Sequence, residues 1–158
     1  MSRTSTSTST SRVLVIANET VESARLHETI LASVGDAPGA EVVVVAPALN
    51  DRLRHWLSDE DEARRSAESR LDAAVESLDD AGVAAVGWVG DADPLQSIDD
   101  ALCFFAADTL IIATHPEARS HWLARNLVDR ARDRFAGTIV HVQVKSEPVR
   151  EPAGKVAA

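Results

Sequence analysis

Five short runs of aliphatic and β-branched residues, separated by longer amphipathic stretches, set the strongest limit on how this chain can fold. Most of these runs are apolar at every position, which is typical of strands that are covered on both faces. Because the stretches between them show helical periodicity, the pattern predicts an α/β fold: a parallel sheet with right-handed crossovers, sandwiched between helices. The five predicted strands are Val13–Ala17, Glu41–Ala46, Val83–Val89, Thr109–Ala113 and Thr138–Val144.

Four helices are predicted between these strands. The second is marked by a stretch resembling a capping box at Ser58–Asp61 and by Gly82 after its last apolar residue. The third opens with Asp93 as N-cap and Pro94 at its first position. Inside it, Cys103 is expected to be a small buried thiol. The predicted apolar stripes of the four helices are Ala24, Ile30, Leu31 and Val34; Ala63, Ala67, Leu71, Ala74, Val75 and Leu78; Ile98, Ala101, Leu102 and Phe105; and Leu123, Leu127, Val128, Ala131 and Phe135.

The length of 158 residues is that of about one domain. Residues 1–12 are rich in Ser and Thr and carry nothing to bury, which predicts a disordered tail; residues 13–144 form the domain, and 145–158 form a flexible C-terminal tail. The chain has neither an apolar stretch near the ~20 residues needed to cross a bilayer nor the apolar core of a secretory signal. We therefore expect a cytoplasmic protein that does not span a membrane.

The charge of the chain argues against nucleic acid as a partner. Sixteen Lys and Arg oppose 25 Asp and Glu, giving a net charge of −9 where a nucleic-acid binder needs positive charge. The excess of acids lies in residues 59–108, whereas residues 109–158 are positive and could hold a small anion. The five histidines lack metal-ligand spacing, and no nucleophile motif is present, so we expect neither a metal site nor an enzyme.

Ligands of open parallel sheets bind beyond the carboxyl ends of the strands, where the strand order reverses. The residues at the predicted strand ends are therefore the first candidates for a binding site. They are Asn18 and Glu19, Ala46 and Pro47, Gly90 and Asp91, and Thr114 and His115.

Two segments carry a resemblance to a known family. Gly90-Asp91-Ala92-Asp93-Pro94 and the later stretch Ala107–His115 resemble the universal stress protein family, in which a Gly-Asp-Pro-like turn opens the third helix and an Ala-Asp-Leu-Ile-Val-like strand leads into a Gly-x-His-Gly loop. The element order over residues 13–144 also fits. The resemblance implies a Rossmann-like three-layer sandwich with a five-stranded parallel sheet in the order 3-2-1-4-5. It also implies dimerisation through the last strand, about 138–144, and, in one subgroup, ATP held by a glycine-rich loop after strand four.

The sequence departs from that ATP-binding loop at each glycine. Residues 113–126 contain none, and Pro116 has no N–H to offer a phosphate. Asn18 also stands where the family usually has an Asp that meets the nucleotide. A replacement anion site remains open, in which charges and donors near the last helix would hold the phosphate of ATP or AMP. Its residues would be His115, Arg119, Ser120, Arg125 and Asn126.

Two functional hypotheses follow. The first is a non-catalytic regulatory or stress-response binding module of the universal stress type, homodimeric, with weak or no ATP binding, no resident cofactor and a possible protein partner. The second is a nucleotide-binding protein with slow ATPase activity that uses Arg119 and Arg125 in place of the glycine loop.

Overall fold

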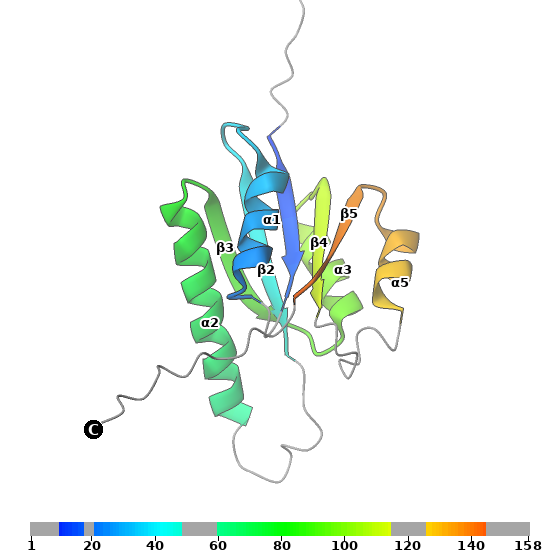
Figure 1. The fold of residues 1–158 in the computed structure, drawn as a ribbon. Helices are drawn as coiled ribbons and strands as arrows, with labels where there is room; N and C mark the ends of the chain where they lie inside the picture. Colours follow the sequence, from blue (N-terminus) through cyan, green and yellow to red (C-terminus); the bar gives the residue numbers. More distant parts are fainter. Residues whose placement is uncertain (1–9, 18–20, 49–59, 115–125, 145–158) are drawn as a thin grey trace, which may run out of the picture.

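The computed structural model describes residues 10–17, 21–48, 60–114 and 126–144. Five strands and four helices alternate along these residues (Figure 1). In chain order they are β1 (Arg12–Ile16), α1 (Ala24–Val34), β2 (Glu41–Pro47), α2 (Glu60–Asp80), β3 (Ala84–Gly90), α3 (Pro94–Phe104), β4 (Thr109–Thr114), α5 (Leu127–Arg134) and β5 (Thr138–Gln143). The first strand begins one residue earlier than predicted, and the other described strands lie within one residue of their predicted ends.

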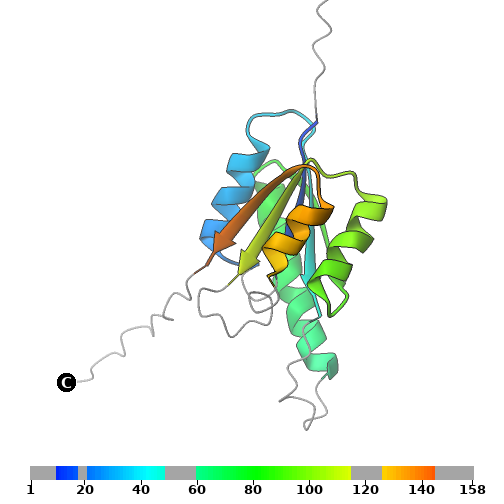
Figure 2. The same cartoon turned by 90° about the vertical axis from the view of Figure 1, so that its right-hand side faces the viewer.

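All strand pairings are parallel, and the strand order is β3-β2-β1-β4-β5. Both the α/β class predicted from the apolar runs and the order implied by the family resemblance are therefore confirmed. Helices α1 and α2 cover one face of the sheet and α3 and α5 the other, which makes three layers; Figure 2 shows α1 on one side and α3 and α5 on the opposite side.

Strand β1 shows why the buried strands are apolar at every position. Val13 and Val15 pack into the cluster under α1 and α2, whereas Leu14 and Ile16 pack into the cluster under α3 and α5. All four side chains are fully buried. Alternate side chains point to opposite faces, so covering both faces requires an unbroken apolar run.

The helix start signals read from the sequence are partly confirmed. Asp93 caps α3 through its carboxylate, which accepts a hydrogen bond from Leu95 N at 3.0 Å, and Pro94 occupies the first turn. Ser58 and Asp59, the first residues of the stretch that resembles a capping box before α2, lie outside the described part of the chain. Helix α1 begins after Ser23, whose hydroxyl accepts from Leu26 N at 3.5 Å.

Two predictions of burial were wrong. Ala24 is exposed, and Leu26 takes the buried position two residues later, because α1 starts at Ala24 and the side of the helix that faces the sheet passes through Leu26, Ile30 and Val34. Cys103 is also exposed rather than buried. It lies on the outer side of α3, while Ile98 and Ala101 point to the sheet.

Within the described ranges, no helix combines the length and the apolar character needed to cross a membrane.

Candidate functional site

The reversal of strand order places the candidate site at the carboxyl ends of β1 and β4. The chain leaves β1 toward α1 on one face of the sheet and leaves β4 toward α5 on the other, so the strand order reverses between these two strand ends. The described residues at this edge are Ala17, which follows β1, and Thr114, which ends β4. Of the candidate residues read from the sequence, Asn18, Glu19, His115, Arg119, Ser120 and Arg125 lie outside the described residues.

On the β2 and β3 side of this edge, the candidate residues form a tightly packed wall. Pro47 pairs with Gly90, and Ala48 N donates to Gly90 O at 3.2 Å. Ala46 and Pro47 are both buried. A Cβ atom on Gly90 would lie 2.5 Å from Ser97 Oγ and 2.7 Å from Val45 Cγ1, so a glycine is needed for α3 to approach this closely.

The Asp91 turn holds α3 in place. Asp91 Oδ1 accepts a hydrogen bond from Asp93 N at 2.8 Å, and Asp91 O accepts one from Ser97 Oγ at 2.9 Å. Ser97 is buried, so its hydroxyl needs this partner. The Gly-Asp-Ala-Asp-Pro stretch thus joins β3 to α3 by its own hydrogen bonds, and Asp91 acts as a positioning residue.

On the β4 and β5 side, Thr114 contacts a histidine that the sequence analysis did not select. Thr114 Oγ1 lies 2.8 Å from His141 Nε2, and the Thr114 side chain is buried. The pKa of His141 is lowered, first by burial and second by the positive charge of Arg132. His141 is therefore neutral at pH 7. Its Nε2 accepts a hydrogen bond from the Thr114 hydroxyl in one tautomer and donates one to it in the other.

The Thr114–His141 pair is a polar contact between two strands inside an otherwise apolar sheet face. The residues are 27 positions apart, and their strands become neighbours only through the parallel pairing of Ile112 with His141. The alternation of Ile139, His141 and Gln143 places His141 on the face of α3 and α5. The alternation along this strand could be read from the sequence, but the contact between His141 and Thr114 could not.

Asn126 occupies the position before α5 with a left-handed backbone, φ 50°, and its side chain caps no helix N–H. Asn is one of the few residues that adopt this conformation at modest cost. Asn126 is exposed. Its side-chain amide is therefore open to solvent beside the first turn of α5, where the sequence predicted an anion.

Two of the arginines on α5 contact carboxylates. Arg132 Nη1 lies 3.2 Å from Asp129 Oδ1, and Arg134 forms an ion pair with Asp99 on α3. Both pairs are largely exposed, so each contributes little to stability. The positive charge predicted for the last third of the chain thus lies partly along α5.

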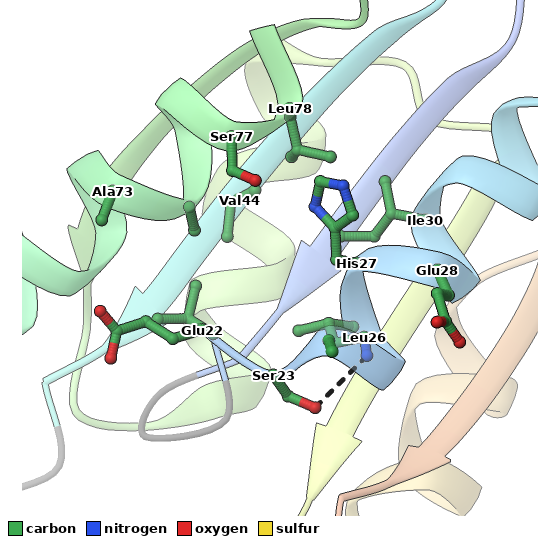
Figure 3. A pocket seen from close by; sticks show the side chains of 13 residues that line it. Glu22, Ser23, Leu26, His27, Glu28, Ile30, Val44, Ala73, Ser77 and Leu78 are labelled. Atoms are coloured by element: carbon green, nitrogen blue, oxygen red, sulfur yellow. Dashed lines mark hydrogen bonds between the residues drawn. The ribbon is translucent and has the colours of Figure 1, made fainter. Parts of the chain in front are cut away.

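A cavity of about 420 Å³ lies on the other face of the sheet from α3 and α5, between α1 and α2. Figure 3 shows His27 of α1 reaching toward Ser77 and Leu78 of α2, with Val44 of β2 behind them. Glu22 and Ser23 line the cavity where α1 begins. Sequence reasoning missed this cavity because it depends on how far apart the two helices pack, which no local pattern records.

Solved structures give the clearest comparison for this arrangement. A protein from the universal stress protein family of Burkholderia pseudomallei is 18% identical, with a TM-score of 0.59, over 85% of this chain and 96% of that chain. A second structure, described as hypothetical protein MJ0577 in a structure-based assignment of biochemical function, is 14% identical, with a TM-score of 0.61, over 86% of this chain and 97% of that chain.

These likenesses show the fold: the chain is built as a universal stress protein is built, over nearly the whole of the compared chain. The resemblance carried by Gly90–Pro94 and Ala107–His115 is thereby confirmed for the fold. No protein-family model and no curated protein sequence matches the chain.

Proposed function

We propose that this chain is a non-catalytic binding module of the universal stress protein type, which works by associating with other molecules during stress. The observation that carries the proposal is the fold, which aligns with 96% of a structure from that family at a TM-score of 0.59. Because one fold can host several functions, nucleotide binding and oligomeric state each need a separate test.

The proposal includes weak or no ATP binding. A phosphate cradle built from main-chain N–H groups requires close approach of the backbone, which glycine permits. Residues 113–126 contain no glycine, and Pro116 lacks an N–H. At the other side of the edge, the Asp91 carboxylate and carbonyl already accept hydrogen bonds from Asp93 and Ser97.

The proposal also includes a homodimer formed through β5. This strand is one edge of the sheet. Thr138 N donates to Asp108 O and Val144 N to Thr114 O, so the even-numbered residues turn their N–H groups toward β4. The backbone groups of Ile139, His141 and Gln143 therefore face the open edge, where a second copy can pair with them.

Nucleotide titration tests the binding part of the proposal. Isothermal titration of ATP, ADP and AMP into the purified chain is expected to give no saturable signal below millimolar nucleotide. Saturable binding that is lost in Arg119→Ala, together with slow ATP hydrolysis, would instead establish the nucleotide-binding alternative.

The oligomeric part is tested by light scattering. We expect a dimer mass for the unmodified chain and for Gln143→Ala, and a monomer mass for Gln143→Pro, because proline removes an N–H that points away from β4. Gln143 is exposed, so neither variant disturbs the core. A monomer mass for all three chains would contradict the dimer.

A further inference from the structure

Strand β3, the other edge of the sheet, carries an uncovered apolar face. Val86 and Trp88 pair with Val43 and Val45 of β2, which are buried under α3. Helix α3 does not extend over β3, and Val86 and Trp88 are therefore 56% and 38% exposed. With Phe104 of α3, which is 86% exposed, they are the exposed large apolar side chains of the described residues. We name Val86 and Trp88 the β3 strip.

The backbone of β3 offers hydrogen-bonding groups along the same edge. Gly90 O accepts from Ala48 N, so the even-numbered residues of β3 turn toward β2. Ala85 N donates to the Asp79 carboxylate at 3.1 Å, so the odd-numbered residues turn to the open edge. The Asp79 side chain occupies the amino end of this edge, at Ala85. Further along the strand, the backbone N–H and C=O groups of Gly87 and Val89 point toward the open edge. A further strand can pair there.

The two faces of β3 would meet different side chains of an added strand. On one face lies the β3 strip. On the other lies α2, packed so closely that a Cβ on Gly87 would be 2.9 Å from Leu71 Cγ. Asp79 extends from α2 to the open edge, and Asp72, two turns earlier, lies on the same side of the helix. An added strand therefore needs apolar side chains on one face and basic side chains on the other.

Charge favours a basic occupant. Residues 71–114, which include all of β3, contain no Lys or Arg. The same residues hold Asp72, Glu76, Asp79, Asp80, Asp91, Asp93, Asp99, Asp100 and Asp108. A second copy would bring the same acidic helix α2 to the edge, with like charges and a second helix beside the first. A single extended segment carrying Lys or Arg meets neither obstacle.

We infer that the β3 edge is a docking surface for an extended segment of a partner protein in which apolar residues alternate with Lys or Arg. The segment adds to the sheet as a sixth strand. Its apolar side chains pack on Val86 and Trp88, and its basic side chains face Asp72 and Asp79. The inference does not depend on the proposed function, because β5 and the strand-end site take no part in it.

The test uses the full chain and a fluorescein-labelled synthetic peptide of alternating Val and Lys. Its controls are the same peptide with Glu in place of Lys and one with Pro at two Val positions. Fluorescence anisotropy is expected to show saturable binding of the Lys peptide at least about tenfold tighter than either control. Hydrogen exchange of the Gly87 and Val89 amides is expected to slow when the Lys peptide is bound.

Substitutions locate the binding. Trp88→Ala, and the milder Val86→Thr in case the first disturbs folding, are expected to weaken the Lys peptide about tenfold and about threefold. Asp72→Lys is expected to weaken it as well. Gln143→Pro, at the opposite edge, is expected to leave it unchanged.

Three results would overturn the inference. The first is equal binding of the Lys and Glu peptides. The second is binding that survives Trp88→Ala with no change in the exchange of Gly87 and Val89. The third is a dimer mass for the chain alone that Trp88→Ala abolishes and Gln143→Pro does not, because the occupant would then be a second copy.

Discussion

The close approach of α3 to β3 depends on one missing side chain, that of Gly90. We predict that Gly90→Ala lowers the free energy of unfolding by about 1–3 kcal/mol, because the added methyl group would overlap Ser97 Oγ and Val45 Cγ1. Urea denaturation followed by circular dichroism measures the loss. Ser97→Ala in the same chain is expected to recover part of it, by removing one of the two overlaps. A Gly90→Ala midpoint equal to that of the unmodified chain would contradict this account.

The ionisation of His141 links stability to pH. Its pKa is lowered in the folded chain by burial and by Arg132, whereas the unfolded chain has the ordinary value near 6.5. Below that value the unfolded chain binds the extra proton first, so stability falls as the pH drops, until the folded His141 is protonated too.

We therefore predict that the free energy of unfolding decreases between about pH 7.5 and about pH 5, and that His141→Gln reduces this decrease. Urea midpoints at a series of pH values measure both slopes. Equal slopes for His141→Gln and the unmodified chain would contradict the role of His141.

At the scale of single elements, Asp93 determines where α3 begins. Asp93→Ala removes the acceptor for Leu95 N, and we predict a loss of about 1 kcal/mol in the free energy of unfolding. Asp93→Asn keeps an acceptor at the same position and is the matched control, with an expected loss near zero. Thermal unfolding of the three chains separates the outcomes, and equal melting temperatures for Ala and Asn would show that the cap does not matter.

The elements also show where sequence patterns were sufficient. Asp93-Pro94 specified the start of α3 because both the cap and the fixed proline φ act within one turn. The exposure of Cys103 was missed because the prediction relied on residue type, since free cysteines are usually buried. Cys103 lies outside the apolar stripe of Ile98, Ala101, Leu102 and Phe105, on the outer side of α3.

At the scale of the whole molecule, the central strands hold two apolar clusters together. Ile111 belongs to the cluster under α1 and α2, Ile112 to the cluster under α3 and α5, and both are fully buried. We predict that Ile111→Ala and Ile112→Ala each lower the free energy of unfolding by about 2–5 kcal/mol.

Both variants are expected to unfold in one transition, because β4 belongs to both layers and neither cluster persists without it. Urea unfolding followed at once by circular dichroism and by tryptophan fluorescence checks this. Separate transitions for the two probes in either variant would show that the faces are independently stable.

The candidate site was predictable only in part. Ala46, Pro47, Gly90, Asp91 and Thr114 do lie at strand ends along one edge, as parallel strands require. Asp91 accepts hydrogen bonds within its own turn, from Asp93 N and Ser97 Oγ. The partner of Thr114 was missed because His141 approaches it across two strands that are joined through a helix.

The sequence by itself determined the α/β class, the strand positions and the start of α3, because these follow from periodicity and caps that act within a few residues. The tertiary structure alone decided which polar side chains meet, as in the Thr114–His141 pair. It also decided which apolar side chains are left uncovered, as at Val86, Trp88 and Phe104. Both outcomes depend on the register of neighbouring strands and on how far each helix extends over the sheet, and these are set by contacts between residues far apart in the chain.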